Sequence, residues 1–518
     1  MTIGIECGYP PLNTKGKRTV IKVAMRTFHQ VQTTVERGIS SSNWAIYAGC
    51  GVLSNPSLVV ARRWRLFFLA SLFLQLAHSF PSTAVAAEIA TMADRGYDNL
   101  RTHHYLPPDF DNEVFDSLWT VWPEPEKSKA ETSDAATRRR LTFSYYGVIP
   151  DPDDVDGSRP ALGYVVDREG NWSMNCLACH GGKVAGRTIP GLPNSHTALQ
   201  TFSEDIRAVK LTLGKALSHL DYGSIQTPLN MTDGTTNAVV FGIVLGAYRN
   251  PDMTVELNRR LPPLLHHDVD APPFWNVRKK SSLYIDGFAP KTARPLMQFI
   301  LLPRVTPEQL TKWEPEFAEI LAWIESLEPP KYPFEINREL ATQGEQVFNR
   351  NCARCHGTYG PEGKYEQKTI PLDEIGTDTL RMKSLTPEHR SWMKRGWLSR
   401  FGEDHVEVDP VGYVAPPLDG IWASAPYFHN GSVPTLWHVL HGDSRPPVWK
   451  RTEDGYDQTR VGLEIEPFEK VPKLANLPAQ RRRYFDTRLP GKSSAGHRFP
   501  DDLTEPEKQA VLEYLKTL

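Results

Sequence analysis

One five-residue pattern, Cys-x-x-Cys-His, occurs twice and constrains the fold more than any other feature of the chain. It stands at Cys176–His180 and again at Cys352–His356. Two cysteines three positions apart lie on one face of a helical turn, so both thiols can bond to the vinyl groups of one haem. The histidine that follows can bind the iron as its proximal ligand. The pattern therefore predicts two covalently bound haems of the c type, held by Cys176, Cys179, His180, Cys352, Cys355 and His356.

Closely spaced cysteines also occur in structural zinc sites and in thioredoxin-like redox pairs. A structural zinc site normally closes around four ligands, and a redox pair has no use for a fixed histidine. The repetition of the whole pattern favours haem over both alternatives. Four of the six cysteines belong to the two motifs, and the other two lie upstream of residue 62. Because bacteria attach haem to this motif outside the cytoplasm, the pattern also predicts a periplasmic or otherwise exported protein.

A segment upstream of the first motif has the three parts of an export signal. Arg62–Arg65 is basic, Leu66–Ala77 is an apolar run too short to span a bilayer, and small residues precede Glu88. We therefore predict a signal peptide over residues 62–87, with a buried core helix as the alternative. Residues 1–61 show no clear periodicity, and we interpret them as a non-native N-terminal extension ahead of the true translation start.

The composition is typical of a globular protein. Of the 518 residues, 40% are hydrophobic and 23% charged, and the 43 prolines favour long loops. Without residues 1–87 the chain is acidic and keeps no basic stripe, which argues against nucleic acid as a partner. An acidic surface suits a small basic redox protein as electron donor. We expect no stable membrane span once the signal is removed.

The chain repeats one arrangement, in which a haem motif, a long insertion and a closing amphipathic helix follow one another. The first closing helix is predicted from a cap at Thr306 to Leu327, and the second from a capping box at Thr504 to the end of the chain. Apolar residues fall at matching positions in Ile320–Leu327 and Val511–Leu518. Each haem motif is therefore expected to share a domain with one closing helix.

A further helix is predicted ahead of the second motif, where Leu340, Gly344 and Phe348 stand at spacings of four. With the last helix of the chain it resembles the crossing helix pair of small c-type cytochromes. The predicted fold is therefore mainly α, with two cytochrome c-like haem domains over residues 88–333 and 334–518 and long loop-rich insertions.

Three segments carry a resemblance to a known superfamily. Ala415–Leu436, which contains the run Tyr-Phe-His-Asn-Gly, resembles the signature of the bacterial di-haem cytochrome c peroxidase and MauG superfamily. Within that superfamily, Asn175–Pro193 and Leu489–His497 resemble the RoxA-like branch, which includes rubber oxygenases. The resemblance extends over most of residues 140–518.

The resemblance implies different roles for the two haems. The N-terminal haem, on His180, carries out the chemistry, and the C-terminal haem, on His356, passes electrons. The superfamily has a tryptophan between the haems, and Trp275 occupies the right interval; core packing is the alternative. Phe288 is expected to form an apolar distal wall as in rubber oxygenases, with core packing again as the alternative. We find no convincing distal acid–base pair, although peroxide cleavage needs a positioned proton relay.

The sixth ligand decides whether each haem carries electrons or stays open to O2 or peroxide. For the second haem the RoxA-like pattern implies His497, and His441 is the next candidate because no methionine follows the signature run. His429 is expected to be structural. The remaining candidates are His405, His438, Met382 and Met393 for the second haem, and His196, His219, His266, His267 and Met297 for the first.

Three functions remain open. The leading hypothesis is an exported di-haem c-type cytochrome oxidoreductase that is peroxidase-like and uses Trp275 between its haems. The second is a RoxA-like haem oxygenase that cleaves an unsaturated hydrophobic compound, although the chain lacks the bulk of rubber-cleaving relatives. The third is a pure electron-transfer cytochrome with both irons six-coordinate. Peroxide or O2 is the small partner in the first two, and a calcium ion between the domains is a further candidate cofactor.

Overall fold

The computed structural model of the chain describes residues 83–154, 159–261 and 263–518. The predicted extension over residues 1–61 lies outside the described residues. The predicted signal peptide over residues 62–87 also lies outside them, except for its end, which begins helix α3 (Thr83–Thr102). No helix within the described residues is both long enough and apolar enough to cross a membrane.

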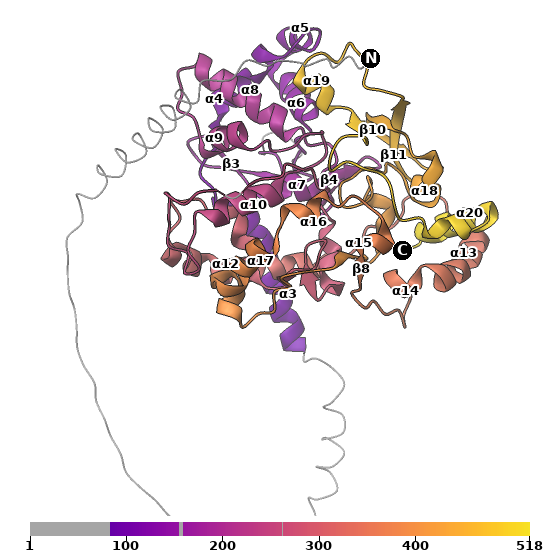
Figure 1. Ribbon diagram of the computed structural model, residues 1–518. Helices are drawn as coiled ribbons and strands as arrows, with labels where there is room; N and C mark the ends of the chain where they lie inside the picture. The colour runs from indigo at the N-terminus through magenta and orange to yellow at the C-terminus, as the bar shows by residue number, and fades with distance from the viewer. Residues whose placement is uncertain (1–82, 155–158, 262) are drawn as a thin grey trace, which may run out of the picture. The chain divides into compact units, whose positions relative to one another are not determined.

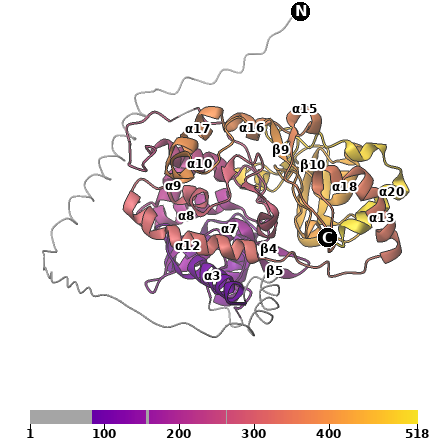
Figure 2. The same ribbon diagram turned by 90° about the horizontal axis from the view of Figure 1, so that it is seen from below.

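Two pairs of crossing helices frame the fold (Figures 1 and 2). Helix α3 packs along α12 (Pro307–Ser326), and α13 (Arg338–Asn351) packs along α20 (Glu505–Leu515). The predicted start of α12 is confirmed, because the Thr306 hydroxyl accepts a hydrogen bond from a first-turn backbone N–H. The predicted capping box at the start of α20 is confirmed as well.

Both crossings depend on a glycine at the point of closest approach. A Cβ added to Gly344 of α13 would overlap the backbone carbonyl of Ala510, and one added to Gly96 of α3 would overlap that of Glu319. The predicted pair α13–α20 is therefore confirmed. The pair α3–α12 has the same construction ahead of the first motif, where the sequence pattern did not indicate it.

Gly344→Ala is expected to lower the free energy of unfolding by about 3 kcal/mol, because the helices must separate to admit the methyl group. In an uncrowded helix the same change stabilises by up to about 1 kcal/mol. Denaturant unfolding of the haem-loaded protein, followed by circular dichroism, measures the difference. Glu345→Ala, at the exposed neighbouring position, is the control and should change stability little. A Gly344→Ala variant as stable as the parent would contradict a close crossing.

The elements around the first motif are short helices, small antiparallel sheets and loops. The helices are α4 (Asn112–Ser117), η1 (Leu118–Val121), α5 (Glu126–Glu131), α6 (Ala135–Tyr146), α7 (Leu177–His180), α8 (Leu199–Thr212), α9 (His219–Gln226), α10 (Ala238–Ala247), η2 (Phe274–Lys279), α11 (Ala293–Leu296) and η3 (Met297–Ile300). The strands are β1 (Phe110–Asp111), β2 (Tyr164–Val166), β3 (Asn171–Met174), β4 (Gly181–Val184), β5 (Arg187–Pro190), β6 (Ser282–Leu283) and β7 (Ala289–Pro290). They pair in the orders β1-β3-β2, β4-β5 and β6-β7.

The elements around the second motif are likewise short helices, small antiparallel sheets and loops. The helices are α14 (Ala353–His356), α15 (Leu372–Ile375), α16 (Leu380–Ser384), α17 (Pro387–Arg395), η4 (Trp397–Gly402), η5 (Ile421–Ala423), α18 (Leu436–Leu440), η6 (Gly442–Ser444), α19 (Pro478–Arg482) and η7 (Phe499–Asp502). The strands are β8 (Thr369–Pro371), β9 (Gly412–Val414), β10 (Val448–Asp457), β11 (Gly462–Phe468) and β12 (Phe485–Asp486), paired as β8-β9 and β11-β10-β12. Helix outweighs strand among the described residues, but the fold is mixed rather than purely helical.

Three clusters of buried apolar side chains form the interior. The first core cluster surrounds α12 and reaches Leu177 of the first motif. The second core cluster surrounds α13 and α20 and includes Trp275. A third cluster is aromatic and lies against α4 and β3, where Phe115 and Trp172 stack with ring centroids 4.7 Å apart. Each haem motif therefore adjoins a large apolar cluster.

The chain returns to the first core cluster after the second motif. Leu385, Met393, Trp397 and Val406 all belong to that cluster, although they follow residue 334 in sequence. In Figures 1 and 2, α16 and α17 accordingly lie beside helices of the first half. Residues 83–518 group into one compact unit, and the predicted boundary between residues 333 and 334 stays a prediction.

Candidate functional site

The first motif is held in place from both sides. Asn175 accepts a hydrogen bond from the N–H of Leu177 (2.8 Å) and donates one to the backbone of α3 (3.0 Å). On the other side, Nδ1 of His180 lies 3.0 Å from the carbonyl oxygen of Pro272. Because a carbonyl only accepts, Nδ1 carries the proton and Nε2 keeps its lone pair for a metal. Pro272 begins what we call the first anchor segment, residues 272–276.

The second motif is anchored in the same manner. Nδ1 of His356 lies 2.8 Å from the carbonyl oxygen of Pro416, which begins the second anchor segment, residues 416–419. Burial lowers the pKa of both proximal imidazoles, that of His180 to about 4. Both rings are therefore neutral at pH 7, the state in which histidine binds a metal.

His497 lies opposite His356. The two ring centroids are 6.3 Å apart. Two imidazoles that bind one metal from opposite sides, with each nitrogen about 2 Å from it, place their ring centroids roughly 6 Å apart. The backbone of His497 is left-handed, with φ at 50°, a strained conformation that clusters at functional sites. The arrangement fits a metal held between the two rings.

The surroundings of His497 also fit a bound group. The ring is buried, and its Nδ1 has no hydrogen-bond partner among the described residues. Burial, and then the neighbouring His356, lowers the pKa of His497 to about 3. Since a buried polar atom without a partner is costly, a metal bound at that nitrogen would compensate. The residues present therefore fit a haem at the second motif, whose iron His356 and His497 would hold.

The other histidines near the second motif have different partners. Both ring nitrogens of His441 are engaged, Nδ1 with the carbonyl of Trp437 (2.7 Å) and Nε2 with Glu505 (2.9 Å). His438 bonds through Nδ1 to Thr435 (2.7 Å). A ring whose two nitrogens are both hydrogen-bonded cannot bind iron without breaking one bond, which disfavours His441.

The remaining candidates for the second haem are placed elsewhere. His405 is exposed, and Met393 packs in the first core cluster. The sulfur of Met382 accepts a hydrogen bond from an arginine of α17. His429 packs on Tyr413, with ring centroids 4.4 Å apart, which agrees with a structural role. His497 is therefore the candidate whose position relative to His356 suits a sixth ligand.

Arg445 holds the loop that carries His497. Its Nη1 donates to the carbonyls of Ser494 (2.6 Å) and Gly496 (2.8 Å), and its Nε donates to that of His438 (2.9 Å). One guanidinium thus binds three carbonyls from two segments, and two of these carbonyls lie just before His497 in the chain. Arg445 is a positioning residue for His497.

Asn430, in the signature run, supports the same loop from another side. The side chain is buried and donates through Nδ2 to the carbonyls of Gly491 (3.1 Å) and Ser493 (3.0 Å). The neighbouring Phe428 has a left-handed backbone, and its ring lies 5.9 Å from that of His497. The signature run thus supports the loop that ends at the candidate ligand.

Arg445→Gln is expected to loosen the ligand loop without touching the iron ligands. Losing several bonds from a charged donor should lower the free energy of unfolding by about 2–3 kcal/mol. The low-spin optical signal of the second haem should become partly high-spin and temperature-dependent. Arg498→Gln is the matched control, because Arg498 follows His497 directly but pairs with acids at the surface. An unchanged spectrum in Arg445→Gln would remove the positioning role.

The first motif lacks such a partner. Within the described residues, no histidine ring lies opposite His180 as His497 lies opposite His356. The candidates are engaged elsewhere: His196 with the carbonyl of Glu453, His219 with Asp109, His266 with Asn237, His267 with Leu265 and Ser384, and Met297 in the first core cluster. The first motif therefore has a candidate ligand, His180, on one side alone among the described residues.

The four motif cysteines have free thiols. Cys176 is exposed, whereas Cys179, Cys352 and Cys355 are half-buried, and none of them forms a disulfide. Free thiols beside a neutral histidine are what covalent haem attachment requires. Among the described residues, no group of three or more acidic, histidine or cysteine side chains is arranged to hold a metal ion, and the calcium ion stays a prediction.

Phe274 and Trp275 lie between the two motifs. Phe274 stacks on the ring of His180, with centroids 4.0 Å apart and planes 19° apart. Trp275 is 1% exposed and packs in the second core cluster. Its indole N–H donates to the carbonyl of Asp419 in the second anchor segment (2.7 Å). Adjacent residues therefore contact the surroundings of different motifs.

The two anchor segments are also joined by a second bond. Asn276, which is buried in the first anchor segment, donates through Nδ2 to the carbonyl of Pro417 in the second (3.0 Å). Together with Trp275 it ties the carbonyl that orients His180 to the carbonyl that orients His356. The two proximal histidines are therefore held in one hydrogen-bonded framework, with Trp275 at its centre.

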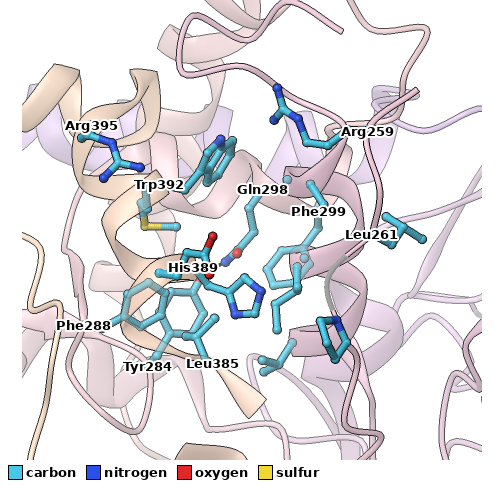
Figure 3. Close-up of a pocket in the computed structure, with 18 of the residues that line it drawn as sticks. Arg259, Leu261, Tyr284, Phe288, Gln298, Phe299, Leu385, His389, Trp392 and Arg395 are labelled. Atoms are coloured by element: carbon cyan, nitrogen blue, oxygen red, sulfur yellow. Dashed lines mark hydrogen bonds between the residues drawn. The ribbon is translucent and has the colours of Figure 1, made fainter. Parts of the chain in front are cut away.

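Phe288 lines a cavity of about 890 Å³. Phe288, Leu385 and Met393 of its wall belong to the first core cluster, which also contains Leu177 of the first motif. Figure 3 shows Phe288, Tyr284 and Leu385 together at one end of the cavity. The Phe288 and Tyr284 rings stack with centroids 5.0 Å apart. Phe288 is therefore both a core residue and part of a cavity wall.

No sequence pattern predicted this cavity. Its floor is α10, where Gly242 and Gly246 stand four positions apart and let Gln298 and Trp392 approach the helix closely. The opposite wall comes from α16 and α17, more than 130 residues later in the chain. The glycine spacing is the signal in the sequence, but it does not identify which segment lies opposite.

Comparison with known proteins adds three similarities. A protein-family model described as RoxA-like, cytochrome c-like matches residues 412–450. The uncharacterized protein y4iM of Sinorhizobium fredii is 31% identical over 286 residues, which cover 49% of this chain and 62% of that protein. The uncharacterized protein y4iJ of the same organism is 28% identical over 259 residues, which cover 37% of this chain and 41% of that protein. The chain thus spans less than two thirds of either relative.

The family match covers the second anchor segment, the signature run and Arg445. It supports the RoxA-like cytochrome family, and with it a haem cytochrome oxidoreductase that carries haem c. The matched residues are those that orient His356 and hold the loop of His497. The wider resemblance to di-haem peroxidases and MauG stays a prediction.

Proposed function

We propose that the chain is an exported di-haem c-type cytochrome oxidoreductase with one closed and one open iron site. The observation that carries the proposal is the asymmetry of the two motifs, because His356 faces His497 whereas His180 has no histidine opposite it among the described residues. A haem with two strong axial ligands transfers electrons, whereas one with a free position can bind and activate O2 or peroxide.

In this proposal each side chain has a defined task. Cys176 and Cys179 would hold the first haem, and Cys352 and Cys355 the second. The Nδ1–H groups of His180 and His356 donate to the prolyl carbonyls and leave each Nε2 available for a metal. Trp275 connects the two sites through the anchor segments. Its large, easily oxidised ring suits a redox relay between them.

An oxygenase that acts on an apolar compound is the reaction we favour. The cavity beside the first core cluster has apolar walls from Phe288, Leu385 and α10. Its size falls in the range of pockets that bind drug-sized molecules, roughly 300–1,000 Å³. The RoxA-like branch that the sequence resembles includes rubber oxygenases, which act on an apolar compound. The walls would hold the substrate and exclude water from the reacting atoms.

A peroxidase is the second candidate, and His389 favours it. His389 lines the same cavity, and its Nδ1 accepts a hydrogen bond from the N–H of Thr386 (3.2 Å). Burial lowers the pKa of His389, so the ring is neutral at pH 7, and because Nδ1 accepts a hydrogen bond, Nε2 carries a proton that it can donate. Peroxide cleavage needs such a proton carrier. Export, a small redox protein as electron donor and the calcium ion are further parts of the proposal that rest on the sequence.

A resting-state spectrum of the haem-loaded protein tests the proposal. Electron paramagnetic resonance and optical absorption should show one high-spin and one low-spin ferric haem. Two low-spin haems would contradict the open site and leave a pure electron carrier. If the open site is present, uptake of O2 with an apolar alkene supports the oxygenase, whereas uptake of peroxide with a reduced donor supports the peroxidase.

A further inference from the structure

The cavity between α10 and the helices α16 and α17 is cationic as well as apolar. Of the charged side chains that line it, four are arginines and one is an acid, Glu388. Arg259, Arg260 and Arg395 have no acidic partner among the described residues. Figure 3 shows Arg259 and Arg395 at the end of the cavity away from Tyr284 and Phe288. An anionic, partly apolar molecule would match this lining.

The fourth arginine, Arg381, is buried in the cavity wall. It is 2% exposed and pairs through Nη2 with Asp286 (3.3 Å). The same carboxylate also accepts a hydrogen bond from Arg390 (2.6 Å). Two buried guanidinium groups therefore share one carboxylate, which leaves a buried excess of positive charge. Such an excess is unfavourable unless a further anion pairs with it.

One nitrogen of Arg381 is left for that anion. Nη1 is buried and has no hydrogen-bond partner among the described residues. The residue belongs to the cavity lining together with Tyr284 and Phe288. A guanidinium with a free N–H matches a carboxylate, which it binds more strongly than a neutral acceptor.

We propose that the cavity binds an apolar molecule that carries a carboxylate, with the carboxylate on Arg381 and the apolar part along Phe288, Leu385 and α10. The inference deepens the proposed function, on which it rests, because it names the class of compound that the chain would take. The same chemistry has two sources: a separate substrate such as a fatty carboxylate, or a propionate of the first haem. We assign it to a separate molecule, because the cavity is large and its lining includes no residue of the first motif.

Titration of the haem-loaded full chain with decanoate tests this assignment, with decanol as the uncharged comparison. Isothermal calorimetry should show saturable binding of decanoate and at least about tenfold weaker binding of decanol. A tenfold ratio of Kd corresponds to the free energy that one charge-assisted hydrogen bond contributes. Arg381→Gln should weaken decanoate by a similar factor. In this variant Asp286 still pairs with Arg390, so no buried carboxylate is left without a partner.

Lys383→Gln is the matched control, because it removes the same charge from an exposed position on the same helix, α16. It should leave the affinity unchanged. Should Arg381→Gln fail to fold, Ala247→Trp fills the cavity from α10 and should abolish decanoate binding while Arg381 stays in place.

The outcomes separate the two sources. If decanoate does not bind but Arg381→Gln shifts the reduction potential of one haem, the carboxylate is a haem propionate and the separate ligand is wrong. If decanoate does not bind and the potential is unchanged, no carboxylate pairs with Arg381 and the whole inference fails. Because binding is measured without turnover, either failure leaves O2 or peroxide uptake as an independent test of the proposed function.

Discussion

His497→Ala is expected to convert the second haem from low-spin to high-spin while the first haem keeps its spectrum. The ring opposite His356 is the candidate strong-field ligand, and its removal leaves the iron weakly coordinated. Because a nitrogen donor stabilises ferric iron, the reduction potential should rise by on the order of 0.1 V, well within the range that axial ligands control. Optical spectra, electron paramagnetic resonance and a potentiometric titration measure the change.

Two companion variants make the result specific. His497→Gly should give the same spectrum but a protein more stable than His497→Ala by roughly 1 kcal/mol, because glycine accepts the left-handed backbone without strain. His441→Ala should leave both haems unchanged, since both ring nitrogens of His441 have other partners. If the second haem stays low-spin in His497→Ala and the spectrum changes in His441→Ala, the sixth ligand is His441 and not His497.

The parts of the fold that local patterns specify could be predicted from the sequence. The caps at Thr306 and Thr504 mark the closing helices, and the spacing of Leu340, Gly344 and Phe348 predicts the helix that crosses the last one. Each of these signals lies within one turn of a helix or along one helix face. No distant segment is needed to interpret them.

Helix α3 shows how much a pattern depends on its surroundings. Ala93 and Gly96 stand at the same spacing as Ala341 and Gly344, so the two crossing helices share a short motif. Next to a haem motif the second copy is recognisable, whereas the first copy lies far upstream of Cys176 and is separated from it by the segments that form much of the third cluster. The motif is too short to be significant without its partner helix.

The site needed long-range contacts that no local pattern contains. His497 could be proposed from resemblance, but its position depends on Arg445 and Asn430, which gather the loop from more than 40 residues away. The cavity wall combines α10 with Leu385 and Met393, which the chain supplies only after the second motif. Burial of apolar surface drives distant segments such as these to pack together. Apolar residues alone, however, do not specify which segments will meet.

Trp275→Phe is expected to slow electron transfer between the two haems by an order of magnitude or more while ligand binding at the first haem stays normal. The indole lies at the centre of the framework that joins both prolyl carbonyls, and a phenyl ring is much harder to oxidise. The variant should also lose about 2 kcal/mol of unfolding free energy, because the carbonyl of Asp419 loses its donor. Stopped-flow reduction of each haem and turnover with O2 or peroxide measure the effect.

Trp422→Phe separates the redox role of Trp275 from its packing. Trp422 is equally buried, belongs to the same core cluster and donates its indole N–H to the carbonyl of Pro330 (2.8 Å). The two variants should therefore lose similar stability, because each removes one indole and leaves one carbonyl without its donor. Trp275 bonds directly between the two anchor segments and Trp422 does not, so of these two replacements only that of Trp275 should slow transfer between the haems. Equal slowing in both variants would show that packing, rather than the indole of Trp275, governs the rate.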